Sequence, residues 1–191
     1  MSKRGLQQAE ALANYYCNID FGFIYSSDLS RAVDTAKAIL NKRDQIELKQ
    51  EVDLRERKFG IFEGLTSTEA EEQYPVAYQT WTSGSFDFKT KGGESRRELL
   101  ARSKSKLEEI AARHIGDYGI IVVHGGLLST FWRHLDPYRA KNEGFRIPNA
   151  SIAELIYENG EWEVLSWSKI DHLKGIEALS DDTVEGVQTK P

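Results

Sequence analysis

The sequence has very little cysteine and no long apolar run. Its only cysteine among 191 residues is Cys17, so an internal disulfide is excluded. Since free cysteine usually packs as a small hydrophobe, we expect Cys17 to be buried or half-buried. No apolar run approaches the roughly 20 residues that cross a bilayer, and no signal peptide is recognisable at Met1. A disulfide-stapled scaffold and a membrane-spanning protein are therefore disfavoured.

The composition is that of one soluble globular domain. Forty per cent of the residues are hydrophobic, 29% are charged, and the formal net charge is −5. This negative charge disfavours a general nucleic-acid or anionic-membrane surface but permits a local basic pocket. We expect one domain over residues 1–174. Residues 175–191 are polar and acidic, which predicts a flexible tail.

The most informative stretch is a buried-strand pattern that ends in a histidine and two glycines. Ile120 to Val123 is apolar and β-branched, and His124, Gly125 and Gly126 follow it directly. A helix is predicted over residues 127–134. Glycine lets the backbone approach a ligand, and a helix N-terminus offers unpaired N–H groups to an anion. The stretch indicates an anion site at a strand end, with an ordinary strand-to-helix turn as the evenly weighted alternative.

Two further polar side chains follow strand-like segments. Arg31 lies near the start of a predicted helix, and a planar guanidinium suits a phosphate because it can donate two parallel hydrogen bonds. Glu56 follows the strand-like segment 46–54 and precedes a glycine-punctuated loop. A carboxyl held there beside a phosphate could act as a general acid. The alternatives are a solvated arginine and a glutamate paired with Arg55 or Arg57.

The remaining elements are predicted from local patterns. Helices are predicted from apolar spacing over residues 6–16 and 33–40, and from capping boxes that begin at Thr66 and Ser95. Asn159-Gly160 between two alternating segments predicts a β-hairpin. Residues 75–91 are rich in aromatics, which favours a satellite hydrophobic cluster over an aromatic lid on a substrate.

Together these segments resemble the histidine phosphatase superfamily, also called the phosphoglycerate mutase-like family, in that family's order along the chain. The match runs from about Ser2 to about Leu173. The segments that carry it are residues 2–9, residues 25–36 with Arg31, residues 54–64 with Glu56, residues 92–95 and residues 123–126 with His124.

The resemblance implies an α/β fold in three layers, with a mostly parallel sheet and helices on both faces. It implies hydrolysis of a small phosphorylated metabolite through a phosphohistidine, with a phosphoglycerate mutase as an alternative. Arg31, His124 and the Gly125 backbone would bind the phosphoryl group. Glu56 would protonate the leaving oxygen and later activate water. No metal or other cofactor is implied, because cationic side chains neutralise the charge.

One part of the family pattern is missing. The family's first, central strand ends in Arg-His-Gly, whose histidine is the nucleophile, and no histidine of this sequence stands in that context. We therefore expect the central strand to be absent and this chain to be inactive. Either the strand lies upstream in a longer enzyme, or the chain is a pseudophosphatase that binds a phosphate ligand or a protein. Cytoplasmic localisation and a homodimer are further expectations, and an upstream targeting peptide stays open.

Overall fold

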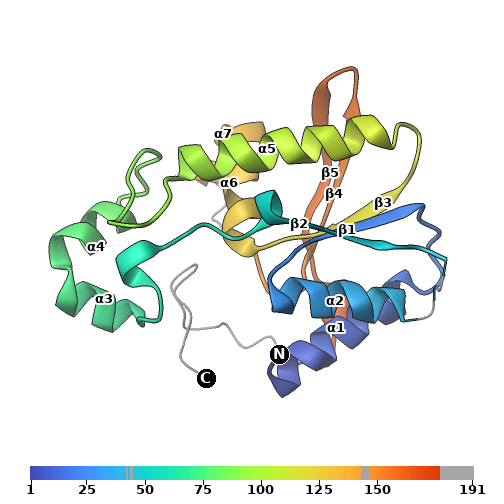
Figure 1. The fold of residues 1–191 in the computed structure, drawn as a ribbon, viewed down its shortest axis with the longest axis horizontal. Helices are drawn as coiled ribbons and strands as arrows, with labels where there is room; N and C mark the ends of the chain where they lie inside the picture. Colours follow the sequence, from blue (N-terminus) through green and yellow to red (C-terminus); the bar gives the residue numbers. More distant parts are fainter. Residues whose placement is uncertain (42, 44, 143–146, 177–191) are drawn as a thin grey trace.

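The computed structural model describes residues 1–41, 43, 45–142 and 147–176 (Figure 1). The helices are α1 (Lys3–Tyr16), α2 (Ser30–Leu40), α3 (Ser67–Gln73), α4 (Pro75–Thr82), α5 (Arg96–Arg113), α6 (Gly125–Leu135) and α7 (Pro137–Asn142). The strands are β1 (Phe23–Ser27), β2 (Leu48–Glu51), β3 (Gly119–Val122), β4 (Ile152–Glu158) and β5 (Glu161–Lys169). Short 3₁₀ helices are η1 (Val52–Leu54), η2 (Gly60–Phe62) and η3 (Asp171–Leu173).

The centre of the fold is a parallel sheet in the order β2-β1-β3. Strand β1 pairs with both neighbours, and Ser26 lies opposite Gln50 of β2 and Val122 of β3. All three strands therefore end at the same edge of the sheet. Arg31, Glu56 and His124 each follow one of these strand ends in the sequence. The parallel register is thus what brings segments far apart in the chain to one place.

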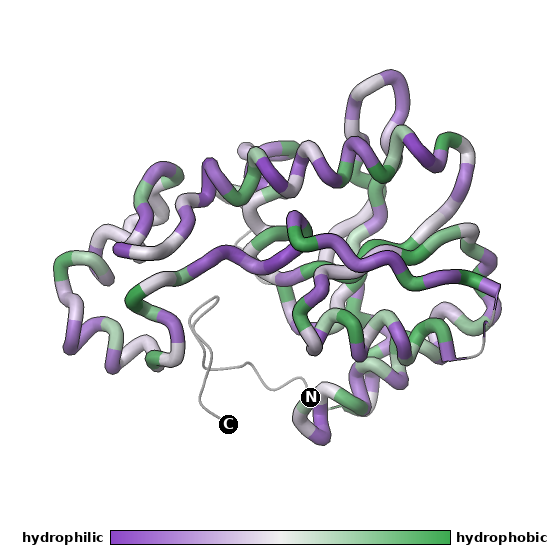
Figure 2. The backbone as a smooth tube through the Cα atoms, in the orientation of Figure 1, coloured by the Kyte–Doolittle hydropathy of each residue, from purple (hydrophilic) through white to green (hydrophobic). Residues whose placement is uncertain are grey.

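Helices cover both faces of this sheet, as the resemblance implied. On one face, Ile24 and Ile120 pack with buried residues of α1 and α2. On the other face, Tyr25 packs with buried residues of α5 and α6. Because side chains alternate along a strand, neighbouring residues 24 and 25 belong to different layers. Figures 1 and 2 show the resulting α/β arrangement, with apolar segments running through the sheet between the helices.

The antiparallel hairpin β4-β5 forms a second sheet. Ile152 of β4 packs in the cluster that holds Ile120, and Leu155 packs against the cluster on the opposite side. The hairpin thus contributes to both layers beside the parallel sheet, yet no ladder joins β3 to β4 within the described residues. The expected absence of a central strand stays a prediction.

The local predictions for the helix starts and the hairpin are confirmed. Thr66 and Ser95 cap α3 and α5 in complete capping boxes. Asn159 and Gly160 both have positive φ, 53° and 87°, which fits the tight turn of a hairpin. Cys17 was expected to be buried or half-buried, and this is wrong: it lies exposed at the C-terminal end of α1.

The aromatic region forms a satellite cluster beyond the start of α5. Phe59 and Phe62 are buried there, and Tyr78 and Trp81 of α4 pack against them. This confirms the cluster that was favoured over a lid. Phe88 lines a small hollow together with Phe59 and Trp81 of this cluster.

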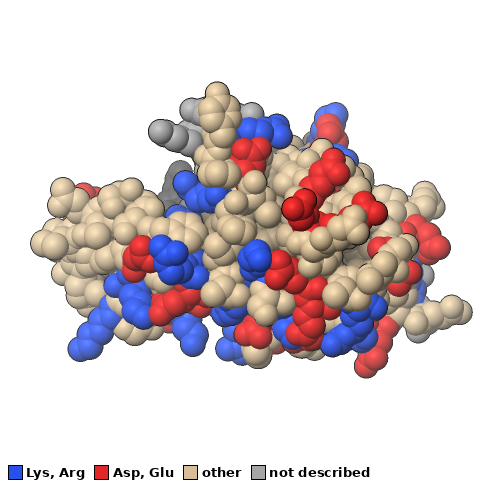
Figure 3. All heavy atoms as spheres, turned by 90° about the horizontal axis from the view of Figure 1, so that it is seen from above, with Lys and Arg blue, Asp and Glu red and all other residues tan. Residues whose placement is uncertain are grey.

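Three observations bear on partners and boundaries. No helix in the described residues is long and apolar enough to cross a membrane. On the face shown in Figure 3, basic and acidic side chains are interspersed. The predicted acidic tail lies outside the described residues from position 177 onward.

Candidate phosphate site

Arg31 and His124 meet directly although 93 positions separate them. Arg31 Nε donates a hydrogen bond of 3.2 Å to His124 Nδ1. Arg31 lies in the first turn of α2, after β1, and His124 is the N-terminal cap residue of α6, after β3. The parallel pairing of β1 and β3 places the two starts of these helices side by side.

This hydrogen bond selects the tautomer of His124. The arginine guanidinium group cannot accept a hydrogen bond. His124 Nδ1 must therefore be the acceptor, and the hydrogen of the neutral ring must be on Nε2. Nε2 is buried and has no hydrogen-bond partner among the described residues. A buried donor without a partner is costly, and an anion bound at this position would remove that cost. Ser26 Oγ, near the carboxyl end of β1, is likewise buried without a hydrogen-bond partner among the described residues.

The electrostatics keep His124 neutral. Burial lowers its pKa to about 3, and the positive charges of Arg31 and Arg102 act in the same direction. The His124 residue is only 6% exposed. A neutral imidazole with Nε2–H can donate to a phosphoryl oxygen, but its remaining lone pair is already used by Arg31.

The lowered pKa of His124 predicts a specific loss of stability in acid. The folded state disfavours the charged ring. The contribution of neutral His124 to the unfolding free energy is therefore complete above about pH 6.5, and it is lost as the pH falls toward 3. Wild type should lose several kcal/mol of unfolding free energy over this range relative to H124Q, at about 1.4 kcal/mol per pKa unit. Urea unfolding at stepped pH measures this difference. H134Q, at an exposed histidine, should follow wild type; equal pH curves for wild type and H124Q would contradict the prediction.

Glu56 lies against the start of α6. Its Oε2 accepts from the Gly126 N–H at 2.8 Å, and its Oε1 accepts from the Arg57 N–H at 2.7 Å. Burial raises the pKa of the Glu56 carboxyl. The two backbone N–H donors lower this pKa, and so do the positive charges of Arg31 and Arg57. A carboxyl with a raised pKa that retains donors for its ionised form is suited to giving and taking a proton.

The predicted alternative partners of Glu56 are resolved by the structure. Arg55 pairs with Asp28 instead, with Nη2 2.5 Å from Oδ2, and Arg57 contributes its backbone N–H. Arg102 of α5 supports the Glu56 segment by donating hydrogen bonds to the backbone carbonyl oxygens of Asp53 and Glu56. Nothing in the local pattern around Arg102 pointed to this positioning role.

The two glycines after His124 have different neighbours. A Cβ on Gly126 would lie 2.4 Å from Glu56 Oε1, so only glycine admits the carboxyl at that distance. A Cβ on Gly125 would meet only the Ile147 carbonyl oxygen, at 3.9 Å. Gly125 thus presents open backbone at the N-terminus of an 11-residue helix, as an anion site requires.

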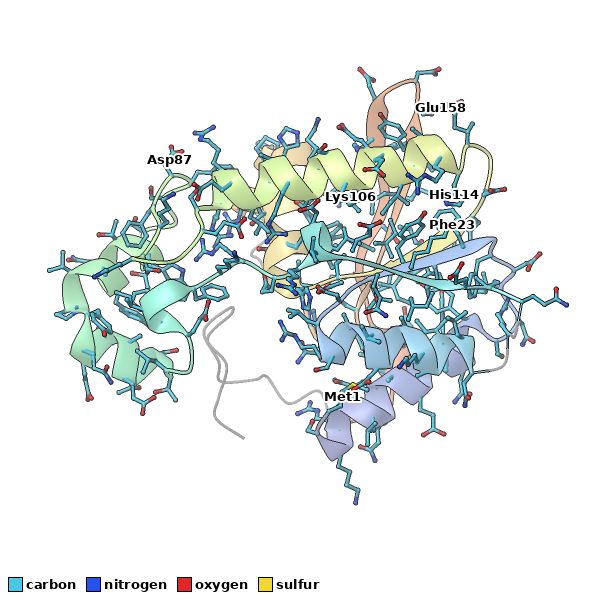
Figure 4. All side chains as sticks on the ribbon, in the orientation of Figure 1. Met1, Phe23, Asp87, Lys106, His114 and Glu158 are labelled. Atoms are coloured by element: carbon cyan, nitrogen blue, oxygen red, sulfur yellow. The ribbon has the colours of Figure 1, made fainter. Side chains whose placement is uncertain are left out.

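The other histidines serve elsewhere. His114 stacks on Phe23 with ring centroids 3.9 Å apart, and the two labelled side chains lie together below the end of α5 in Figure 4. His172 is within 2.9 Å of the Ala150 carbonyl oxygen. His134 lies in the last turn of α6. The described residues contain no group of three or more side chains arranged to hold a metal ion.

The structure defines an α/β protein in which Arg31, Glu56 and His124 lie together at the ends of parallel strands, and comparison with known proteins shows its family. The family model for the histidine phosphatase superfamily (branch 1) matches residues 1–170, so the chain belongs to that superfamily.

Relatives and solved structures agree with this assignment. The chain is 35% identical over 178 residues to the metal-independent phosphoserine phosphatase of Arabidopsis thaliana, covering 92% of this chain and 74% of that protein. It is 32% identical to phosphoglycerate mutase-like protein 4 of the same plant, covering 91% and 76%. A mycobacterial glucosyl-3-phosphoglycerate phosphatase solved with inorganic phosphate is 27% identical, with a TM-score of 0.76 over 90% of this chain and 88% of that one.

Proposed function

We propose that this protein acts on small phosphomonoesters as a histidine phosphatase, and that these 191 residues supply the phosphate-binding and proton-transfer half of the reaction. The observation that carries the proposal is the juxtaposition of Arg31, neutral His124 and Glu56 at the ends of parallel strands. The named activities of relatives, which include phosphoserine phosphatases, support a small phosphorylated substrate.

Each group has a role that follows from its geometry. Arg31 neutralises the phosphoryl oxygens, and His124 Nε2 and the Gly125 backbone donate to them. This matches the need of phosphoryl transfer for fixed donors around three charged oxygens. The Glu56 carboxyl protonates the leaving oxygen. After the alcohol has left, the same carboxylate accepts a proton from the water that attacks phosphorus.

His124 does not serve as the nucleophile in this proposal. Attack on phosphorus requires a nitrogen lone pair, whereas Nε2 carries the hydrogen and Nδ1 accepts from Arg31. The proposed nucleophile is the histidine of an Arg-His-Gly segment, which the 191 residues do not contain. The chain by itself is therefore proposed to bind phosphate esters without turnover, and a pseudophosphatase is the second candidate on the same observation.

Binding of inorganic phosphate tests the site directly. We expect weak binding, because only part of the family's contacts is present. The dissociation constant should be roughly millimolar, which corresponds to a binding free energy of about 4 kcal/mol. R31Q should weaken binding about tenfold or more, because a charge-assisted contact contributes roughly 1.5–3 kcal/mol. Chemical-shift titration by NMR gives the dissociation constants.

The matched control is R97Q, which also removes one arginine. Arg97 is exposed and pairs with Asp87 in the loop before α5, where Figure 4 labels Asp87. R97Q should bind phosphate as wild type does. Equal weakening by R31Q and R97Q would show a general charge effect and would remove the proposed site.

A further inference from the structure

Arg102 of α5 joins three parts of the chain around the Glu56 segment. Its Nη1 donates to the carbonyl oxygen of Asp53 in η1 at 2.7 Å, and its Nη2 donates to the carbonyl oxygen of Glu56 at 3.1 Å. Its Nε and Nη2 also donate to the two carboxylate oxygens of Glu94, at 2.7 and 2.8 Å. The Arg102 and Glu94 side chains are only 22% and 13% exposed. The guanidinium is therefore held on several sides and away from most of the solvent.

This set of contacts requires the shape of a guanidinium group. A carboxylate accepts two parallel N–H bonds from one edge of the planar fork, and the other N–H groups can then reach main-chain carbonyl oxygens. A lysine ammonium keeps the positive charge, but it is a compact donor on a flexible stem and cannot reproduce the fork. Lysine at position 102 would thus preserve the charge and loosen the geometry.

Glu94 is itself fixed in the loop before α5. Its N–H donates to the Lys58 carbonyl oxygen at 2.9 Å, and its Oε2 accepts from the Lys58 N–H at 3.4 Å. Glu94 also directly precedes Ser95, the N-terminal cap residue of α5. Arg102 therefore meets a carboxylate whose position is set both by the start of its own helix and by the segment that carries Glu56.

The position of the Glu56 backbone matters because its carboxyl fits closely on α6. Residues 55–59 belong to no helix or strand, so regular backbone pairing does not fix them. The carboxyl lies 2.8 Å from the Gly126 N–H, in a space where even a Cβ at position 126 would be 2.4 Å from Oε1. A misplacement of about 1 Å can remove a catalytic group from its productive geometry. Contacts that hold the Glu56 carbonyl oxygen therefore control where its carboxyl lies.

We propose that Arg102, held by Glu94, is a positioning residue that keeps the acid/base carboxyl of Glu56 seated on the start of α6. The proposal rests on the proposed function and adds a residue pair on which proton transfer depends. Arg102 acts through Glu56 and is not assigned a contact with the substrate.

The test is an NMR pH titration of the Glu56 carboxyl carbon and the Gly126 amide in the 191-residue chain. In wild type, burial raises the pKa of Glu56 above its ordinary value of 4.5, and the Gly126 amide should follow the same titration. R102K should move the pKa of Glu56 back toward 4.5, because a released carboxyl gains water, and the Gly126 amide should no longer follow it. E94Q, which leaves Arg102 its two main-chain acceptors, should shift the pKa of Glu56 in the same direction by less.

The matched control is R113K, the same substitution on the same helix. Arg113 pairs with Glu109 in an exposed i,i+4 contact, so R113K should titrate as wild type does. A Glu56 titration in R102K that equals that of wild type would overturn the proposal, even if urea unfolding shows R102K to be less stable. E94Q decides in the same way should R102K not fold.

Inorganic phosphate separates failure of this proposal from failure of the proposed function. R102K should bind phosphate within about twofold of wild type, because Arg31 and His124 are kept and lysine preserves the positive charge near His124. Weakened phosphate binding together with an unchanged Glu56 titration would place Arg102 in the phosphate site and overturn the proposal alone. Absence of phosphate binding by wild type would overturn the proposed function, whereas the link between Arg102 and Glu56 would still be decided by the titration.

Discussion

Phosphatase turnover should arise when the chain is extended at its amino terminus by a strand that ends in Arg-His-Gly. The 191 residues by themselves are expected to show none with p-nitrophenyl phosphate or phosphoserine. Removing a nucleophile from a catalytic unit costs roughly 10⁴- to 10⁶-fold in rate, so the difference between the two chains should be of that order.

The structure explains why the extension would place its histidine correctly. Among the residues that the structure describes, β3 pairs with β1 on one edge and with no strand on the other, and His124 lies just beyond its carboxyl end. A strand added parallel to β3 on the other edge would end at the same level, because the carboxyl ends of parallel strands meet at one edge of a sheet. The new histidine would then face a phosphoryl group held by Arg31 and His124.

Three controls make this result interpretable. Alanine in place of the added histidine should abolish turnover, and E56Q should lower it most for substrates with poor leaving groups, because those need protonation. R97Q should leave it unchanged. Turnover by the unextended chain that disappears in H124A would contradict the prediction, since it would identify His124 as a relocated nucleophile.

The same extension should raise the unfolding free energy by several kcal/mol. Within the described residues no ladder joins β3 to β4, although Ile152 and Leu155 of β4 take part in the two core layers. A strand between them would pair backbone groups on both neighbours and bury apolar side chains, each contributing roughly 1.5–3 kcal/mol. Ordering the added residues costs part of this gain, about 1–2 kcal/mol per residue.

Urea unfolding of the two chains, with light scattering, measures this effect. The matched control is an extension of equal length in which prolines replace alternate residues, since proline cannot donate to a ladder. Only the intact strand should stabilise the protein and reduce self-association through the unpaired strand edge. Monomeric chains of equal stability would contradict the prediction and would favour a sheet adapted to the absence of the strand.

Much of the fold follows from patterns within a few residues of each other. The capping boxes at Thr66 and Ser95, and the Asn159-Gly160 turn, satisfy their backbone groups locally, so their sequence signals are reliable. Cys17 shows the limit of residue type alone: it is the C-terminal cap residue of α1 and is exposed, although Tyr16 beside it is buried.

For the candidate site, the sequence selected the residues, but the contacts between them came only from the structure. Motif order along the chain was enough to select Arg31, Glu56 and His124, although local patterns could not say what each side chain touches. The contact of Arg31 with His124 spans 93 positions, and that of Glu56 with Gly126 spans 70. Neither contact could be read from sequence spacing, because both depend on which strands pair and in what register.

The sequence by itself determined the family pattern, the elements and the chemical types available at the strand ends, because these depend on short-range periodicity and on residue identity. Only the tertiary structure decided the tautomer of His124, the close fit of Glu56 on Gly126, and the support of the Glu56 segment by Arg102 of α5. These features depend on distances between elements that are remote in the chain. Such distances are set by packing of the parallel sheet between its helices, which no local pattern encodes.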